Sequence, residues 1–144
     1  MDEDILYKKG FAVKGGDFDK AGEISTQIKA TLKAMGMSND IIRRVAIASF
    51  EAEMNVVIHA EEGTVDFVLT PDAILITFTD KGPGIEDIDL AMKEGYSTAS
   101  DEMREKGFGA GMGLPNIKKS VDDLVINSTV GKGTTLKLTI RYQE

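Results

Sequence analysis

The 144-residue sequence has the usual length of one domain, with 42% hydrophobic and 28% charged residues and no low-complexity stretch. Its formal charge of -7 argues against nucleic acids and anionic membranes as partners, because such binding depends on Lys and Arg contacts. The absence of Cys excludes disulfides, and a single His cannot build a zinc site alone. No segment resembles a secretory signal or a membrane span, so we expect residues 1–144 to form one cytoplasmic domain.

The first part of the chain predicts a strand followed by a helix. Residues 5–13 alternate loosely in apolar character and end at a Gly-Gly pair, which is typical of a strand and a turn. Asp17 or Asp19 can then cap a helix. Over residues 21–35 apolar side chains recur at three- and four-residue steps until Gly36 stops the pattern, so we expect an amphipathic helix with one buried stripe.

A second, more buried helix and a hairpin are predicted next. Ser38 is a favourable N-cap for a helix that runs to about Ala60 and is apolar on more than one face. Residues 65–69 and 74–78 have the composition of short strands. The Thr-Pro-Asp-Ala segment between them has turn chemistry, so the two strands should pair as a hairpin.

The last third of the sequence predicts two helices and two strands. Residues 86–92 favour a short helix, whereas residues 93–113 are rich in Gly and Ser without periodicity, which is typical of a mobile lid. Residues 114–121 favour a helix, and strands are expected near 124–127 and 134–142. This order of elements favours an α+β fold in which helices cover one face of a sheet.

The first candidate site lies on the second helix. Glu51 and Asn55 are four residues apart, so both side chains project from one helix face and can meet the same ligand. Polar groups on so apolar a helix need a polar partner if they are buried. A solvated helix edge is the alternative explanation. His59 continues the stripe, and the helix dipole alone explains a His in the last turn.

The second candidate site is the Asp-Lys-Gly-Pro-Gly-Ile segment at residues 80–85, which follows a predicted strand. Asp80 can accept a hydrogen bond from an exocyclic amine, and Gly82 and Gly84 let a planar base approach the backbone. A tight turn without any ligand is the alternative, because Asp and Gly are common turn residues.

The third candidate site is the glycine run at residues 107–113, directly before a predicted helix. Backbone N–H groups at a helix N-terminus bind phosphate, and glycines expose them. The run does not fit the dinucleotide-binding or P-loop patterns, and the sequence lacks the H-R-D signature of eukaryotic-type protein kinases. A different nucleotide-binding fold is therefore required.

The order of these three motifs resembles the N, G1 and G2 boxes of the GHKL (Bergerat-fold) ATP-binding domains of DNA gyrase, Hsp90, MutL and histidine kinases. The resemblance covers nearly the whole chain, and residues 131–135 are similar to the usual end of the fold. The short length and the segment after residue 80 are similar to the single-domain anti-sigma factors and serine/threonine switch kinases. The resemblance implies a two-layer sandwich with a mixed, mainly antiparallel sheet and a Gly-rich ATP lid.

The resemblance also implies a role for each matching residue. Asn55 would orient Mg²⁺, Asp80 would bind the adenine amino group, and Glu51 would be the general base. The lid cation of the family directly precedes the glycine run, but here Arg104, with Lys106, lies a few residues earlier than the expected place. The residues that would surround ATP or ADP are Asn55, Asp80, Gly82, Gly84, Ile85, Tyr96, Ser97, Thr98, Gly107, Gly109, Ala110, Gly111, Met112, Gly113, Leu114 and Thr134.

The activity implied is that of an ATP-dependent protein-serine kinase in a partner-switching module, with a STAS-domain antagonist as substrate. A sigma factor or a PP2C-type phosphatase would be a further partner, and a homodimer stays open. The alternative is a catalytically weak, nucleotide-gated module that sequesters a sigma factor or activates a phosphatase. A plain ATPase is disfavoured, because this branch lacks the second domain that couples hydrolysis to motion. The first helix and residues 96–104 are candidate docking sites.

Overall fold

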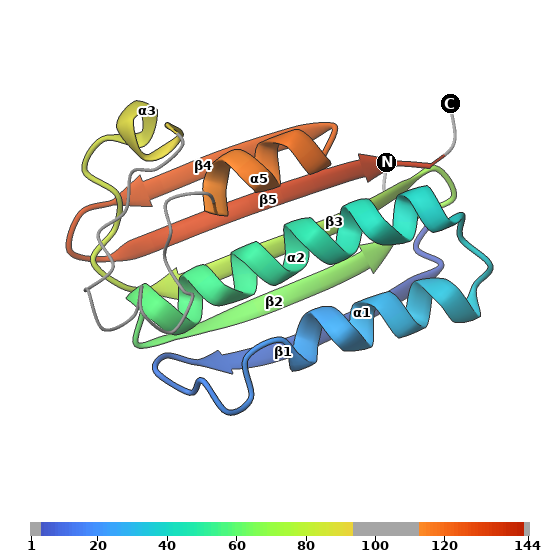
Figure 1. Cartoon of the computed structure of the whole chain (residues 1–144), viewed down its shortest axis with the longest axis horizontal. Helices are drawn as coiled ribbons and strands as arrows, with labels where there is room; N and C mark the ends of the chain where they lie inside the picture. The colour runs from blue at the N-terminus through green and yellow to red at the C-terminus, as the bar shows by residue number, and fades with distance from the viewer. Residues whose placement is uncertain (1–3, 94–112, 143–144) are drawn as a thin grey trace.

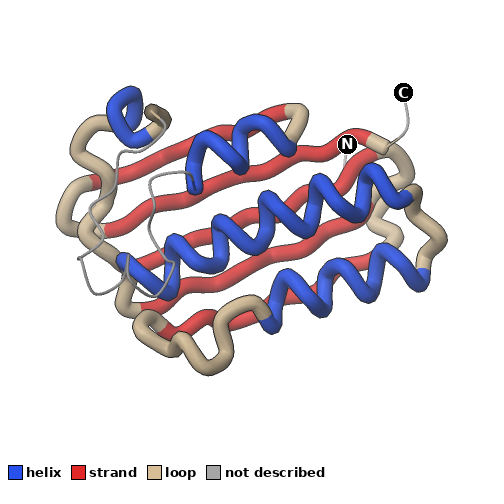
Figure 2. The backbone as a smooth tube through the Cα atoms, in the orientation of Figure 1, coloured by secondary structure: helices blue, strands red, loops and turns tan. Residues whose placement is uncertain are grey.

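The computed structural model describes residues 4–93 and 113–142, which form a two-layer α+β sandwich. Five strands form one sheet in the order β1-β2-β3-β5-β4, and every described pairing is antiparallel. Figure 1 and Figure 2 show α1, α2 and α5 side by side over one face of this sheet. The elements are β1 (Tyr7–Lys14), α1 (Glu23–Ala34), α2 (Asn39–His59), β2 (Glu62–Leu69), β3 (Ala73–Lys81), α3 (Ile88–Ala91), α5 (Gly113–Ser120), β4 (Asp123–Thr129) and β5 (Gly133–Arg141).

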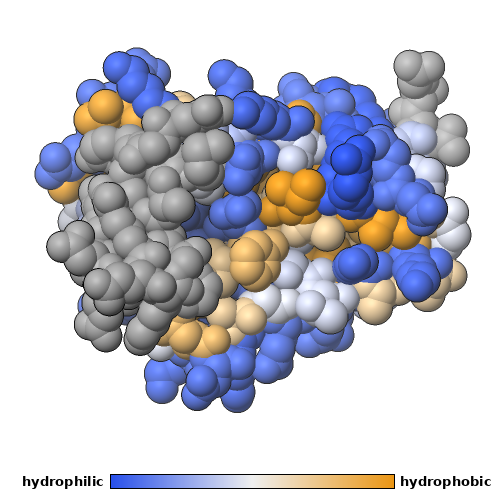
Figure 3. Space-filling view, in the orientation of Figure 1, coloured by the Kyte–Doolittle hydropathy of each residue, from blue (hydrophilic) through white to orange (hydrophobic). Residues whose placement is uncertain are grey.

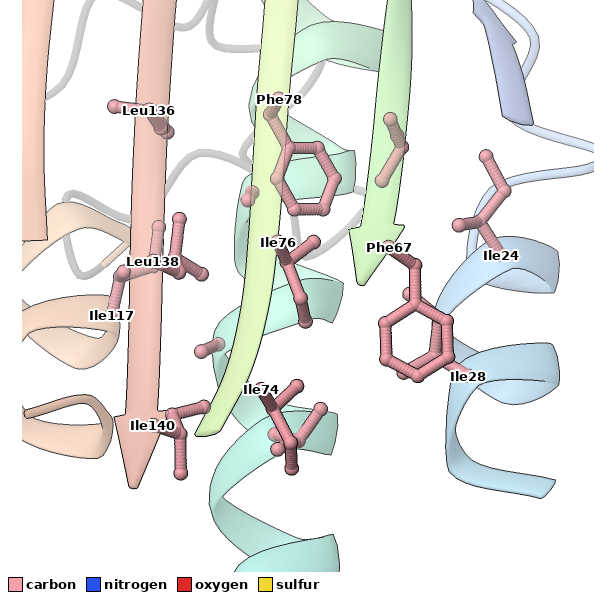
Figure 4. Packing of buried hydrophobic residues seen from close by; sticks show 14 of the residues in the cluster. Ile24, Ile28, Phe67, Ile74, Ile76, Phe78, Ile117, Leu136, Leu138 and Ile140 are labelled. Carbon is pink, nitrogen blue, oxygen red and sulfur yellow. The ribbon is translucent and has the colours of Figure 1, made fainter. Parts of the chain in front are cut away.

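The core lies between the sheet and the helices. Alternate residues of the inner strands are buried, as a sheet with one covered face requires. Phe67 on β2, Ile76 on β3 and Leu138 on β5 pair in one row across the sheet. All three are almost fully buried, and Figure 4 shows them among the other packed side chains. Each such side chain stabilises the fold by about 1.5–3 kcal/mol.

The central helix α2 follows the prediction closely. The Ser38 hydroxyl accepts the N–H of Ile41 at 3.3 Å, so Ser38 is the N-cap as expected. The helix ends at His59, and Ala60 is its C-cap. Fully buried small residues such as Ala48 and Ala52 allow the helix backbone to approach the sheet.

The predicted cap of α1 is wrong. Neither Asp17 nor Asp19 caps this helix, because turns continue through residues 16–22 and the N-cap is Gly22, at φ +95°. The first amides of α1 bind the carboxylate of Glu53, which comes from α2. A side chain distant in sequence therefore replaces the expected local cap.

The remaining predicted elements are present with shifted ends. The β2–β3 hairpin extends beyond the predicted strands, and α3 occupies only part of 86–92. The predicted lid falls almost wholly on residues 94–112, outside the described residues. Within the described part of the chain, no helix has the length and apolar character to cross a membrane.

Candidate nucleotide-binding site

The face of α2 that carries Glu51 and Asn55 meets the first residue of α5. A Cβ atom placed on Gly113 would lie 3.2 Å from Asn55 Oδ1 and 3.7 Å from Glu51 Oε1. The helix N-terminus that ends the glycine run therefore lies directly against both polar side chains. Leu114, the next residue of α5, is buried in the core, so its backbone rather than its side chain belongs to this junction.

The position of α5 is fixed at its other end by Arg44 of α2. The Arg44 Nε donates to the carbonyl oxygen of Ser120, the last residue of α5, at 3.0 Å. A terminal nitrogen of the same guanidinium lies 3.2 Å from Asp122 Oδ1. A cation at the C-terminus of α5 also complements the helix dipole. These contacts hold the C-terminal end of α5 against α2.

The side chains of Glu51 and Asn55 are half-buried and have no hydrogen-bond partner among residues 4–93 and 113–142. No buried side-chain nitrogen or oxygen lacks a hydrogen-bond partner in the described part of the chain, so the oxygens of Glu51 and Asn55 reach solvent and are open to a ligand. Amide and carboxylate oxygens are also the donors that Mg²⁺ prefers, and the missing Cβ of Gly113 leaves room beside Asn55.

Asp80 lies at the end of β3, where Phe78 and alternate residues face the helices. Its Oδ1 accepts the backbone N–H of Thr134 on β5 at 3.1 Å. Burial raises the pKa of the Asp80 carboxyl above its ordinary value, and the Thr134 N–H partly lowers it. One oxygen of this carboxylate is thus held by the sheet, which orients the other.

The segment after Asp80 packs tightly against its neighbours. Gly84 has φ +77°, and a Cβ there would lie 2.5 Å from the carbonyl oxygen of Thr129. A Cβ on Gly82 would lie 3.1 Å from Ala60 Cα. Packing and backbone conformation alone therefore require a glycine at position 84, whereas a Cβ at position 82 would need its neighbours to shift by only a few tenths of an ångström. Ile85 donates its backbone N–H to Ser128 Oγ at 2.7 Å.

Ser128 on β4 is a site residue that the sequence analysis missed. Its hydroxyl contacts Ile85 of the Asp80–Ile85 segment and lies 2.9 Å from the hydroxyl of Thr134. A polar residue at the inward position of a strand, in phase with Leu124 and Ile126, was the available signal. A pocket of about 400 Å³ borders the cluster and is lined by Asp80, Asn127, Ser128, Thr129, Lys132, Gly133, Thr134 and Thr135.

Among the described residues, no group of three or more His, Asp or Glu side chains could hold a metal ion by itself. Mg²⁺ bound with a nucleotide needs few protein ligands, because phosphate oxygens and waters supply the rest. The few oxygen ligands near Asn55 therefore suit an Mg²⁺ ion that arrives bound to a nucleotide better than a metal ion held by the protein alone.

Burial lowers the pKa of His59, which is consistent with a neutral packed side chain at the end of α2.

Several predicted site residues lie outside the described residues, so the structure places only the remaining ones. They are Tyr96, Ser97, Thr98, Arg104, Gly107, Gly109, Ala110, Gly111 and Met112.

Comparison with known proteins decides the family. The family described as histidine kinase-, DNA gyrase B- and HSP90-like ATPase matches residues 21–144. This chain belongs to that ATPase family. Membership of this family implies that the chain binds ATP. The match also confirms the family that the three motifs predicted.

The curated relatives agree with the predicted branch of the family. The serine/threonine-protein kinase RsbT of Bacillus subtilis (strain 168) is 30% identical over 109 residues, covering 73% of this chain and 76% of RsbT. The anti-sigma F factor of Caldanaerobacter subterraneus subsp. tengcongensis is 34% identical over 103 residues, or 68% of each chain. The expectation of an enzyme of the serine/threonine-kinase class is confirmed by these relatives.

Solved structures confirm the fold. A chain of the SiaB–SiaC complex from Pseudomonas aeruginosa superposes with a TM-score of 0.64 at 15% identity, covering 94% of this chain and 89% of that chain. The RsbU and RsbW domains of a Mycobacterium tuberculosis protein give 0.61 at 17% identity, covering 92% of this chain and 32% of that longer chain. At such identities the likeness concerns the fold alone.

Proposed function

We propose that this chain is an ATP-dependent protein-serine kinase of a partner-switching module, and that its substrate is a STAS-domain antagonist. The observation that carries the proposal is the close approach of Gly113 to Asn55 and Glu51. The helix N-terminus would bind phosphate, the Asn55 oxygen would hold Mg²⁺ and the Glu51 carboxylate would act as base, all at one place. Residues 1–144 would act as a single domain, in the cytoplasm, because cytosolic ATP is the phosphoryl donor.

Different groups of the site would bind different parts of ATP. The N–H groups at the start of α5 would bind phosphate oxygens, and Asn55 Oδ1 would hold Mg²⁺. When bound, Mg²⁺ supplies positive charge that neutralises the phosphate tail. Asp80, fixed by Thr134, would accept a hydrogen bond from the adenine amino group. The phosphates and the base would thus be anchored on different elements.

Glu51 would act on the substrate serine. The serine oxygen forms a bond to the terminal phosphorus of ATP while the bond to the bridging oxygen breaks and ADP leaves. The serine proton passes to a carboxylate oxygen of Glu51. A positioned base of this kind contributes a factor of about 10² to 10⁴, and positioning and charge neutralisation supply more.

Exposed apolar side chains beside Glu51 support a protein substrate. Ile47 is 41% exposed and Phe50 is 39% exposed, and both lie on α2 within one turn of Glu51. Figure 3 shows hydrophobic surface among the hydrophilic side chains of this helix-covered face. Aromatic residues are enriched in protein interfaces. A sigma factor, a PP2C-type phosphatase or a second copy of the chain are further candidate partners.

The second candidate function is a nucleotide-gated binding module. The relatives called anti-sigma F factor favour it, because their name refers to a sigma factor and not to phosphoryl transfer. In that case nucleotide would set the affinity for a sigma factor or a phosphatase, and Glu51 would contribute little.

Calorimetric titration with ATP and Mg²⁺, followed by phosphate transfer to STAS-domain proteins, separates these functions. Glu51→Gln should keep ATP affinity and lose transfer by about 10² to 10⁴. Asn55→Ala should lose the Mg²⁺-dependent part of ATP binding. Glu61→Gln, at an exposed position, is the matched control and should change neither. ATP binding without transfer by the wild type would favour the binding module, and no ATP binding would remove the proposed site.

A further inference from the structure

We propose that one end of the helix layer is a docking surface for an acidic protein segment that carries apolar side chains. At this end the C-terminus of α1, the N-terminus of α2 and the C-terminus of α5 lie together, as Figure 1 shows. The inference goes beyond the proposed function, because binding at this surface requires neither a nucleotide nor phosphoryl transfer. It is carried by a local reversal of charge and by exposed apolar side chains on the same face.

This end of the helix layer is basic, although the chain as a whole is acidic. Residues 29–47 and 116–122, which form it, contain six basic and two acidic residues, whereas the whole chain has a formal charge of -7. The two acidic side chains are already bound, since Asp40 lies 2.9 Å from Arg43 and Asp122 lies 3.2 Å from Arg44. The basic residues are Lys29, Lys33, Arg43, Arg44, Lys118 and Lys119. An anionic partner is therefore attracted here and repelled by the rest of the surface.

Helix dipoles account for only part of this basic cluster. Lys33 and the two lysines of α5 lie in last turns, where a cation is favoured. Arg43 lies near the N-terminus of α2, where the dipole does not favour a cation, and Lys29 lies in the middle of α1. Both of these residues are exposed. The cluster therefore has more positive charge than the helix ends require.

Exposed apolar side chains lie on the same face. Arg43, Ile47 and Phe50 are separated by four and then three residues, so they form one stripe along α2. Ile47 is 41% exposed and Phe50 is 39% exposed. A Cβ on Gly22, the N-cap of α1, would lie 3.4 Å from the Phe50 ring, so this ring lies beside α1. Figure 3 shows hydrophobic surface between hydrophilic side chains over this part of the helix layer.

The lysines of α1 lie on the side of this stripe. Gln27 of α1 accepts a hydrogen bond from Lys9 Nζ of β1 at 3.3 Å, so the side chain of Gln27 lies on the side of the sheet edge. Lys29 is two residues further along, about 200° around the helix, so it lies on the opposite side, toward α2. Lys33 follows one turn later on the same side. Cations thus border the apolar stripe of α2.

A protein segment fits this surface better than a membrane or a nucleic acid does. The Phe50 ring is more than half buried and lies against α1, so it can receive a partner side chain but does not project far into a lipid layer. A nucleic acid would bind through its phosphates and would leave Ile47 and Phe50 uncovered. An acidic segment with apolar side chains pairs with both the cations and the stripe. Protein interfaces combine an apolar centre with a polar rim of complementary charge in this way.

The test measures the binding of a fluorescent helical peptide to the full chain by anisotropy at low ionic strength. The probe has leucines on one face and glutamates on its flanks, and a matched peptide has lysines in place of the glutamates. The glutamate peptide should bind about tenfold tighter or more. The net charge of -7 alone predicts the opposite preference, so the comparison isolates the local surface. Equal affinities, or tighter binding of the lysine peptide, would overturn the inference.

Charge reversal locates the binding surface. Lys29→Glu combined with Arg43→Glu should weaken binding of the glutamate peptide about tenfold or more. Lys8→Glu combined with Lys137→Glu is the matched control, because it makes the same change in net charge at exposed positions on the sheet face opposite to the helices. The control should weaken binding far less. Equal losses in the two double variants would overturn the inference, because net charge alone would then explain the binding.

A second pair of variants tests the apolar stripe. Phe50→Ala should weaken binding of the glutamate peptide about tenfold, as expected for an aromatic residue at the centre of an interface. Val125→Ala is its control, since Val125 is 49% exposed but belongs to β4, away from the helix layer. Val125→Ala should bind like the wild type. A Phe50→Ala protein with unchanged affinity would overturn the inference.

Sedimentation with vesicles of phosphatidylserine and phosphatidylcholine tests the membrane alternative. Binding to these vesicles without a preference for the glutamate peptide would overturn the inference in favour of a lipid surface. A wild type that binds no ATP would instead refute the proposed function. The two failures are distinguishable, because the peptide titrations contain no nucleotide.

Discussion

The carboxylate of Glu53, on α2, accepts the backbone N–H of Ser25, in the first turn of α1, at 3.0 Å. Its second oxygen accepts the N–H groups of Gly22 at 2.9 Å and Ile24 at 3.4 Å. The side chain is only 2% exposed, so this charge is buried and satisfied by the amides of another helix. A negative charge at a helix N-terminus is also favoured by the helix dipole. Glu53 thus joins α1 to the helix that carries the candidate site.

Glu53→Ala should lower the free energy of unfolding by about 2–4 kcal/mol, because it leaves the first amides of α1 buried without an acceptor. Glu53→Gln keeps one acceptor oxygen and should lose less. Urea denaturation at neutral pH measures both. Glu61→Ala, at an exposed position, is the control and should stay within about 0.5 kcal/mol of wild type. A Glu53→Ala protein as stable as that control would mean that water replaces the carboxylate.

Glu53 also indicates where sequence reasoning ends. Glu51 and Glu53 are two residues apart, so they point about 200° away from each other around the helix. The Glu51–Asn55 face was predictable, since both residues lie on one element and a four-residue spacing defines a face. The Glu53 partner is 28 residues away in sequence, and nothing in the local pattern connects them. The local rule offered Asp17 or Asp19 instead, and it was wrong.

The same distinction holds for the sheet and the base-binding end of the site. Local signals predicted the β2–β3 hairpin, the cap at Ser38 and the helix after the glycine run. The pairings of β1 with β2 and of β3 with β5 join distant segments, so periodicity could not predict them. Ser128 was missed for this reason, because its role depends on a β4–β5 hairpin folded against Ile85.

Gly113→Ala should weaken Mg²⁺-dependent ATP binding about tenfold or more with little change in stability. Gly113 is the first residue of α5, outside the helix interior where alanine is favoured over glycine by about 1 kcal/mol, so the substitution should change the stability of the helix little. The new Cβ would lie 3.2 Å from Asn55 Oδ1, and loss of even an outer-shell partner of a metal ligand costs about 10–100-fold in metal affinity. Calorimetry with and without Mg²⁺ measures the effect.

The control for Gly113→Ala is Gly10→Ala on β1, where the nearest atoms would be 3.8 Å away or more. It should leave ATP binding unchanged. Equal ATP affinities for Gly113→Ala and wild type would show that Asn55 can move aside without loss, and would remove it from the metal site.

Asp80→Asn should stabilise the protein at neutral pH while it weakens ATP binding. Burial raises the folded-state pKa of Asp80 above 3.8, so the folded protein holds this proton more tightly than the unfolded chain does. The stability that belongs to the protonated form is therefore present below pH 3.8 and lost as pH rises through the folded pKa. Asn stays neutral, and its oxygen can still accept the Thr134 N–H. The gain in melting temperature should be largest near pH 7 and shrink as pH falls toward 3.8.

The control for Asp80→Asn is Asp66→Asn, which removes one charge at an exposed position of a chain with net charge -7. It should reproduce only the general effect of a less negative chain. A melting-temperature difference between Asp80→Asn and wild type that did not change with pH would contradict the argument, because only a titrating carboxylate makes the difference depend on pH.

Gly84→Ala should lower the free energy of unfolding by about 2–4 kcal/mol, whereas Gly131→Ala should cost only about 1 kcal/mol. Both residues have positive φ, +77° and +82°, so both substitutions carry the cost of a left-handed alanine. A Cβ on Gly131 would meet no atom within 4 Å, but a Cβ on Gly84 would lie 2.5 Å from the carbonyl oxygen of Thr129. Chemical denaturation of the two variants therefore isolates the close approach of the Gly84 backbone to the β4–β5 hairpin. If both variants lost equal stability, the segment after Asp80 would be able to move away from the hairpin at no cost. The hydrogen bonds from Gly131 to Pro83 and from Ile85 to Ser128 would then not fix the segment after Asp80 against the hairpin.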